Sequence, residues 1–366
     1  MNEKLNIIDK LIAENHLDAI ALIPGPNFTW LTGMEKFLME RPTVLIYKPG
    51  EKAALIIAGF EVNSMKDIPV PFEPFAFDDN PMHWAESFKK AGKFLKLEGK
   101  RIGVESIHFR FLETSFLKQN IPGCEIVAGD NLFRQLRMHK NEQEKALMRK
   151  AALIAQNALT ETLKIAKPGV TEREIASELV VQLFRNGSDP TLPFNPIVAS
   201  GPNTADPHAE VSDRKLQKGD FLLVDWGARY QGYCSDITRT FGIGEISDHQ
   251  HLIYETVRKA NRAAVAQAKP GVSAGSVDKA ARDVITAAGF GQYFTHRVGH
   301  GLGLEAHEDP YMFSGNEQIL ETGMSFTDEP GIYITGDAGV RIEDDVIVTE
   351  DGCITGTDFP RELQII

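Results

Sequence analysis

Two stretches of the chain repeat each other, and this repeat limits the folds that the sequence can adopt. Residues 166–171 (AKPGVT) and 268–273 (AKPGVS) each end an alanine-rich stretch and precede another helical stretch. Further along, residues 219–225 and 323–329 share a pattern in which a glycine, an apolar run and an acid follow one another. The matching order predicts two α/β half-domains related by pseudo-symmetry, with their acids converging near the axis. The alternative is a chance similarity between two Pro-Gly helix stops, which the matching order of elements disfavours.

The acids of this repeat lie where strands are expected to end. The apolar run 221–224 predicts a buried strand that leads into Asp225, and a following segment brings Asp236. A buried acid costs free energy unless a positive group meets it, so two acids on paired strands could share one cation. Later stretches add a histidine and two more acids, namely His300, Glu329 and Glu343. One imidazole and four carboxylates suit two divalent ions such as Mn, Co, Fe or Zn, with carboxylates bridging them.

Each of these residues also has an ordinary explanation when it is taken singly. A strand-end aspartate such as Asp225 often caps or pairs, and Glu329 could be a turn residue before a proline. Arg239 could simply neutralise Asp236 in a surface ion pair. His300 lies between two glycines and could be a loop histidine. The joint pattern favours a metal site, because each acid is tied to an apolar strand and the glycines allow close backbone approach.

The length and composition indicate an ordinary soluble protein with two domains. Domains commonly hold about 100–200 residues. For a chain of 366 residues we therefore expect a small α/β domain over 1–132 and a second domain over 133–366. The net charge of −12 argues against nucleic acid or an anionic membrane as a partner. Three widely spaced cysteines fit reduced thiols in the cytoplasm, and we expect neither a signal peptide nor a membrane span.

Several stretches together resemble a known enzyme family. DWGARYQGYCSDITRTF, GHGLGLEAHE, DEPGIY and GVRIEDD are similar to the ligand-bearing motifs of the Xaa-Pro dipeptidase (prolidase) and aminopeptidase P family of dinuclear metallopeptidases. NFTWLTG is similar to that family's creatinase-type N-terminal domain. The resemblance covers nearly the whole chain and implies an α/β (α+β) protein with a pita-bread C-terminal domain. It also implies that Asp225 binds one ion, that His300 and Glu329 bind the other, and that Asp236 and Glu343 bridge both.

The same resemblance implies roles for residues around the metals. His208 matches a histidine that contacts the scissile carbonyl, and His307 matches one that handles the far end of the substrate or a proton. Arg341 would hold a bridging carboxylate in place, as metal sites commonly require. Three further residues would line the substrate pocket, namely Phe194, His296 and Tyr333. For His296, a structural loop histidine is an equal alternative.

The activity implied by the resemblance is hydrolysis of Xaa-Pro bonds, in dipeptides or at peptide N-termini. Two divalent ions, with Mn favoured over Co, Zn or Fe, would supply a bridging hydroxide by lowering the pKa of a shared water. Glu329 would transfer the proton as a general base and then acid. The alternatives are a creatinase-like hydrolase of a non-peptide C–N bond and a non-catalytic peptide-binding relative. Since relatives are often homodimers, the loop 35–41 either reaches a neighbour's active site or is an ordinary surface loop.

Overall fold

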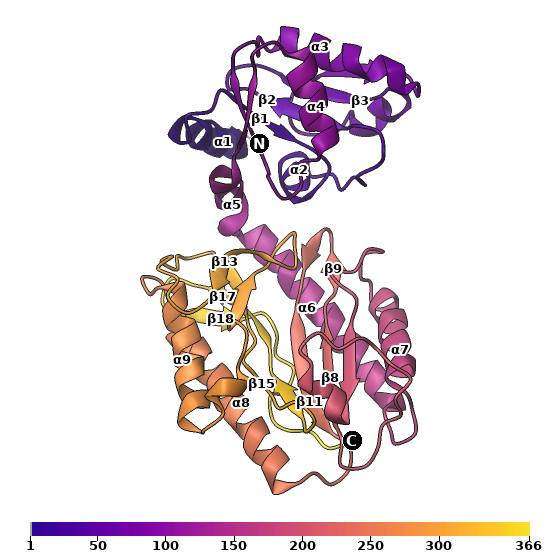
Figure 1. The fold of residues 1–366 in the computed structure, drawn as a ribbon, viewed down its shortest axis with the longest axis vertical. Coiled ribbons are helices and arrows are strands. Elements are labelled where there is room, and N and C mark those ends of the chain that lie inside the picture. Colours follow the sequence, from indigo (N-terminus) through magenta and orange to yellow (C-terminus); the bar gives the residue numbers. More distant parts are fainter. Residues whose placement is uncertain (1) are drawn as a thin grey trace. The chain divides into compact units, whose positions relative to one another are not determined.

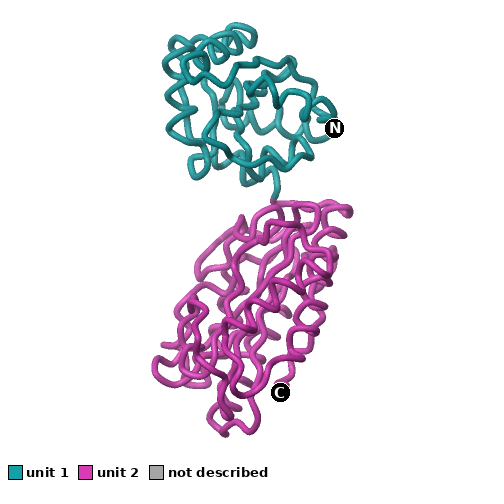
Figure 2. Tube along the Cα trace, turned by 90° about the vertical axis from the view of Figure 1, so that its right-hand side faces the viewer, with its two compact units in different colours: residues 1–137 teal, residues 138–366 magenta. Residues whose placement is uncertain are grey.

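The structure is a computed structural model that describes residues 2–366 and divides into two compact units, 1–137 and 138–366 (Figure 2). The division follows Arg137, whereas the sequence suggested residue 132. The difference arises because helix α5 (Asp130–Met138) is attached to unit 1, where Arg137 Nε donates a hydrogen bond to Asn27 Oδ1 at 3.0 Å. None of the helices within residues 2–366 is both long enough and apolar enough to cross a membrane.

Unit 1 is built on one mixed sheet of six strands in the order β4-β3-β2-β1-β5-β6 (Figure 1). Strand β2 runs antiparallel to β1 and β3, and the other neighbours are parallel. The adjacent strands β1, β2 and β3 are buried over their whole length, as is typical of apolar strands covered on both faces. The strands are β1 (Ala19–Leu22), β2 (Val44–Tyr47), β3 (Ala53–Ala58), β4 (Phe72–Phe77), β5 (Arg101–Val104) and β6 (Glu125–Ala128). The helices are α1 (Asn2–Glu14), α2 (Pro26–Thr32), η1 (Gly59–Met65), η2 (Pro81–His83), α3 (Trp84–Phe94), α4 (Phe111–Asn120) and α5.

Unit 2 contains two halves of the same design, each with a pair of helices and a set of strands (Figure 1). The Pro-Gly stretches 166–171 and 268–273 join α6 to α7 and α8 to α9, so the sequence repeat corresponds to a structural repeat. Three of these helices begin with a capping box, in which the N-cap and N3 side chains both bond main-chain N–H groups. The helices are α6 (Glu142–Thr162), η3 (Leu163–Ile165), α7 (Glu172–Arg185), η4 (Gly201–Ala205), α8 (Asp248–Gln267), α9 (Ala274–Ala287) and η5 (Gly291–Tyr293).

The strands of the two halves belong to separate sheets, ordered β11-β8-β7 and β13-β12-β14-β17-β18, with two small hairpins beside them. Hydrogen bonds join the halves, because Glu343 N donates to Thr238 O at 3.1 Å and Thr240 Oγ1 donates to Arg341 O at 3.0 Å. The first half contains β7 (Ile197–Ser200), β8 (Phe221–Trp226), β9 (Arg229–Tyr230), β10 (Tyr233–Cys234) and β11 (Ile237–Gly242). The second contains β12 (Gly299–Gly301), β13 (Glu308–Met312), β14 (Ser325–Asp328), β15 (Gly331–Tyr333), β16 (Gly339–Arg341), β17 (Asp344–Val348) and β18 (Cys353–Thr355).

Glycines allow segments of unit 2 to approach one another more closely than side chains would permit. A Cβ added to Gly299 would lie 1.7 Å from Thr327 O, and one added to Gly339 would lie 1.9 Å from Thr204 O. Real Cβ atoms essentially never come within 3.0 Å of another heavy atom in this way. These two glycines therefore set the spacing of β12 against β14 and of β16 against η4.

Candidate metal centre

Two strands of the first half bring two aspartates to the same end of an antiparallel pair. Thr238 of β11 lies opposite Asp225 of β8, and Asp236 lies directly before β11. Every residue of both strands is buried, the mostly apolar β8 and also β11, which contains Thr238, Arg239 and Thr240. The fold therefore carries the two carboxylates into the interior of unit 2.

Strand ends of the second half add a histidine and two glutamates to this position. His300 lies in β12, Glu329 directly follows β14, and Glu343 directly precedes β17. His300 Nε2 lies 3.3 Å from Glu329 Oε1 and 3.8 Å from Asp236 Oδ2. Asp236, His300 and Glu343 each offer one ligand atom, and these atoms lie within 4.8 Å of one another. Residues from both halves therefore meet, as the pseudo-symmetry predicts.

These side chains line a cavity of about 580 Å³ in unit 2. The cavity contains every residue that the sequence analysis proposed for the site except Tyr333, whose hydroxyl lies 3.0 Å from His296 Nε2 and accepts a hydrogen bond from Arg341 at 2.8 Å. Tyr333 thus contacts two of the lining residues, His296 and Arg341. The lining residues are Phe194, Asn195, Ile197, Pro207, His208, Asp225, Asp236, His296, Arg297, His300, His307, Glu329, Arg341 and Glu343.

The carboxylates of the cavity carry more negative charge than the surrounding protein neutralises. Burial, followed by repulsion from Glu343 and Asp225, raises the pKa of Asp236 well above its usual value. Burial and repulsion from Glu329 and Asp225 likewise raise the pKa of Glu343. Oδ1 of Asp225 is buried and has no hydrogen-bond partner among the described residues. This excess of buried oxygen ligands, together with one imidazole, fits a divalent cation such as Mn, Fe, Co or Zn.

Arg341 and Thr238 fix the orientation of the carboxylates. Arg341 donates a hydrogen bond to Asp225 Oδ2 at 2.6 Å and another to Thr238 Oγ1 at 3.0 Å. Thr238 Oγ1 in turn donates to Glu343 Oε2 at 2.5 Å. The resemblance implied that Arg341 holds a bridging carboxylate. In the structure its ion pair is with Asp225, and it reaches the expected bridging residue Glu343 only through Thr238, which the sequence analysis did not single out.

The other expected histidines surround the carboxylates. His307 lies against His300, with ring centroids 3.8 Å apart, and burial followed by the nearby His300 lowers the pKa of His307 to about 4. Burial also lowers the pKa of His296. His208 is exposed where it borders the cavity. His307 is therefore a neutral imidazole beside the carboxylates, and His208 is an accessible imidazole at the border of the cavity.

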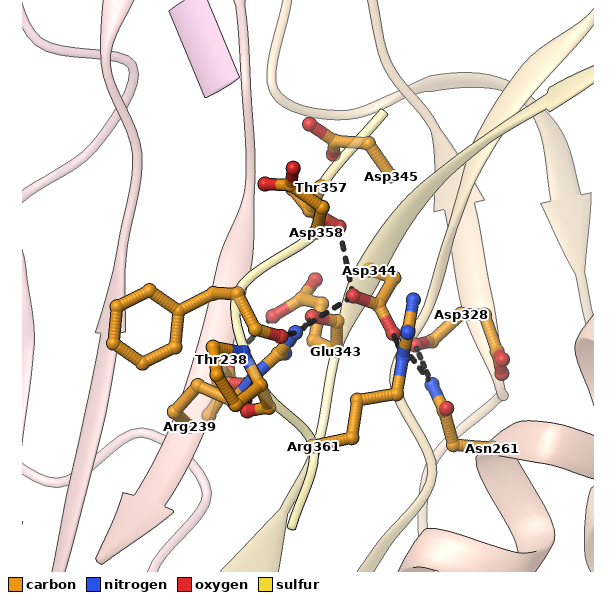
Figure 3. A network of polar contacts seen from close by, with 12 residues as sticks. Thr238, Arg239, Asn261, Asp328, Glu343, Asp344, Asp345, Thr357, Asp358 and Arg361 are labelled. Carbon is orange, nitrogen blue, oxygen red and sulfur yellow. Dashed lines mark hydrogen bonds and ion pairs between the residues drawn. The ribbon is translucent and has the colours of Figure 1, made fainter. Parts of the chain in front are cut away.

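Arg239 is not a surface residue that neutralises Asp236. It is 1% exposed and forms a buried ion pair with Asp344, with NH2 2.8 Å from Oδ1 (Figure 3). The alternative of a surface pair is therefore wrong, because the alternation of β11 turns Arg239 away from the cavity while its neighbour Thr238 faces Glu343. Arg297, which also lines the cavity, was part of the stretch THRVGHG but was not identified from the sequence.

Comparison with known protein families gives two matches that together span most of the chain. Residues 146–350 match metallopeptidase family M24, and residues 4–139 match the creatinase/prolidase N-terminal domain. The chain is 37% identical to the Xaa-Pro dipeptidase of Pyrococcus horikoshii, over 99% of both chains. It is 34% identical to the probable dipeptidase PepE of Mycobacterium tuberculosis, over 97% of this chain and 93% of that protein.

Solved structures show the same similarity over the full length. A dipeptidase from Pyrococcus horikoshii superimposes with a TM-score of 0.93 at 36% identity, covering 99% of this chain and 100% of that one. An X-Pro aminopeptidase from Thermotoga maritima superimposes with a TM-score of 0.85 at 30% identity, covering 98% and 99%. The expected fold class, an α/β N-terminal domain with a pita-bread C-terminal domain, is therefore confirmed.

Proposed function

This chain belongs to metallopeptidase family M24 and carries a creatinase/prolidase N-terminal domain, and from that premise we propose that it hydrolyses Xaa-Pro dipeptides. The observation that carries the proposal is the cavity in unit 2, where buried carboxylates outnumber the positive groups that face them. A cavity of about 580 Å³ lies within the usual range for small ligands, which suits a dipeptide. The names of some relatives support the choice, since a relative at 37% identity and a solved structure at 34% are named dipeptidases, whereas an X-Pro aminopeptidase is 30% identical.

We propose two divalent ions, with Mn favoured, as the cofactor. Asp225 would hold one ion, and His300 with Glu329 would hold the other. Asp236 and Glu343 would lie between the two, a placement supported by the electrostatic repulsion that each of them receives from both Asp225 and Glu329. Bound ions of this kind lower the pKa of water and polarise a substrate carbonyl.

The side chains around the centre have separate tasks in the proposed reaction. Glu329 accepts the proton of the attacking water and returns it to the nitrogen of the departing proline. His208, exposed at the cavity border, donates a hydrogen bond to the carbonyl oxygen as negative charge develops there. His307 is neutral at physiological pH and can therefore accept a hydrogen bond from the substrate amine. Phe194 and His296 bound the space that the two side chains of the substrate occupy.

We further propose that the chain acts in the cytoplasm as a homodimer. Cys124, Cys234 and Cys353 are free thiols, which suits a reducing compartment. In the loop 35–41, Phe37 is 70% exposed and its neighbours Leu38 and Met39 are also exposed. Contiguous exposed apolar side chains commonly mark an interaction site, so we place the second copy on this loop.

One experiment tests the proposed activity against its alternatives. Purified protein is assayed with Xaa-Pro, Xaa-Pro-Yaa and creatine, and the metal content of the same sample is measured. We expect Xaa-Pro cleavage that is lost with EDTA and restored by Mn or Co. Cleavage of Xaa-Pro-Yaa alone would assign an aminopeptidase, and turnover of creatine alone would assign a creatinase-like hydrolase. Full activity without bound metal contradicts the proposal, as does peptide binding without metal or turnover.

A further inference from the structure

Unit 2 also contains a buried network of polar side chains centred on Asp344, next to Glu343 in the sequence (Figure 3). The Asp344 carboxylate is 0% exposed and accepts hydrogen bonds from four side chains. Arg239 donates at 2.8 Å, Arg361 at 2.6 Å, Thr357 at 2.7 Å and Asn261 at 3.1 Å. The two arginines each pair with one oxygen of this carboxylate, Arg239 with Oδ1 and Arg361 with Oδ2. Asp344 is therefore a buried carboxylate whose two oxygens are both bonded.

Arg239 connects this network to both halves of the fold. Its NH1 donates to Thr238 O at 2.9 Å and to Glu343 O at 2.6 Å. Its Nε and NH2 donate to Pro360 O at 3.0 Å and to Phe359 O at 2.7 Å. One guanidinium thus joins β11, the residue before β17 and the segment 357–361.

These contacts act directly on the position of Glu343. Its carbonyl oxygen is held by Arg239, its N–H by the carbonyl of Thr238, and its carboxylate by the hydroxyl of Thr238. The guanidinium of Arg239 is oriented in turn by Asp344, which Arg361 and Thr357 hold from the other side. The Glu343 carboxylate is therefore aimed into the cavity by a chain of contacts that begins in the segment 357–361.

The segment 357–361 is itself anchored to unit 2. Tyr254 Oη donates to the carbonyl of Arg361 at 3.0 Å. Just beyond the segment, Gly242 N donates to Gln364 O at 2.9 Å and Ile366 N donates to Gly242 O at 2.9 Å. The segment consequently has a fixed place against α8 and β11 from which it can support Asp344.

We propose that the segment 357–361 is a positioning element of the metal centre, in which Arg361 acts through Asp344 and Arg239 to hold Glu343 in its ligand geometry. The inference rests on the proposed metal-dependent function. Arg361 touches neither substrate nor metal, so its effect appears first in metal affinity. Buried ion pairs contribute little to stability compared with apolar packing of the same volume, so a role in orienting Glu343 accounts better for this network than stability alone.

The test compares two arginines that line the same groove of unit 2. Arg361 is 27% exposed and pairs with Asp344, whereas Arg258 is 21% exposed and pairs with Glu255 and Glu362. Metal-free R361Q and R258Q are titrated with Mn in a calorimeter, and their melting temperatures are measured. We expect R361Q to bind Mn about tenfold more weakly, at the low end of the loss seen when partners of metal ligands are removed. R258Q should bind Mn as the wild type does.

Further variants separate positioning from folding. Thr357→Val removes one hydrogen bond to Asp344 and leaves both arginine partners of that carboxylate in place, so it remains testable if R361Q does not fold. R361K should recover part of the Mn affinity, and the peptidase activity of R361Q at limiting Mn should recover with excess Mn. Equal Mn affinity in R361Q, T357V and R258Q overturns the inference and leaves the proposed function intact. A wild-type protein that binds neither Mn nor Co, Zn or Fe refutes both.

Discussion

The clustered carboxylates predict that removal of one of them has opposite effects on stability with and without metal. Asp236→Asn keeps the size of the side chain and removes one negative charge from a position that is 4% exposed. In metal-free protein this substitution relieves repulsion, so we expect the free energy of unfolding to rise. With Mn present, the neutral amide cannot replace a bridging anion, so the stabilisation by metal should disappear.

The magnitude follows from the spacing of the ligand atoms. Those of Asp236 and Glu343 lie within 4.8 Å of each other. At an effective dielectric constant of about 20, two unit charges at that distance repel by about 3.5 kcal/mol. Uptake of a proton by the wild type already relieves part of this repulsion. We therefore expect the substitution to raise the free energy of unfolding by about 1–3 kcal/mol, or Tm by roughly 2–12 °C for a unit of this size. Mn at about 100 times its Kd should add about 2.7 kcal/mol to the free energy of unfolding of the wild type and nothing to that of D236N.

The assay is differential scanning calorimetry of wild type and D236N, in EDTA and in excess Mn. Asp344→Asn is the control, because Asp344 is equally buried but pairs with Arg239 and Arg361. Breaking a buried pair costs about 3–5 kcal/mol, so D344N should melt below the wild type even in EDTA. A D236N protein that melts below the wild type in EDTA would refute the repulsion argument. A Mn-dependent rise in its Tm would refute the bridging role.

Three further variants test other parts of unit 2. His208→Ala should retain metal, measured by elemental analysis. Its kcat should fall about 10²–10³-fold, as kcat does when a hydrogen-bond donor to the oxyanion is removed. Unchanged kinetics would remove His208 from the mechanism. Lys140→Met removes the ammonium group that lies 2.7 Å from the buried carboxylate of Glu308. The free energy of unfolding, measured in urea, should fall by about 3–5 kcal/mol. An unchanged free energy would show that the pair is solvated. Gly299→Ala places a Cβ 1.7 Å from a carbonyl oxygen and should yield insoluble protein, whereas Gly352→Ala meets no atom within 4 Å and should express normally.

The residues that face the cavity could be predicted because their signals are local. An acid at the end of an apolar run, such as Asp225, or a histidine between glycines, such as His300, can be identified within a few positions. The repeated Pro-Gly stretches then place these signals in two equivalent halves. The strand-end ligands and the repeated helix ends are both present in the structure, because they depend on strand burial and helix termination rather than on distant partners.

The supporting residues could not be predicted because their partners depend on how strands from the two halves meet. Arg239 has Asp236 as a close acid in the sequence, yet it pairs with Asp344 in the other half. Arg341 similarly pairs with Asp225 of the first half. No local pattern contains this information, because it arises only when β11 lies beside the segment 339–343. Sequence patterns therefore identify the residues of such a site more readily than the contacts that orient them.

The tight glycine contacts bear on how a duplicated domain can diverge. After a duplication, exposed positions and even core positions can change, because neighbouring side chains adjust to a new shape. Gly299 and Gly339 have no such freedom, since the atom that an added Cβ would meet is a main-chain oxygen within 2 Å. A larger residue at either position would fit only if the neighbouring backbone moved as well, and a single substitution does not provide that movement. We therefore expect the fold to constrain the spacing between these segments more tightly than the side chains that the segments bring together.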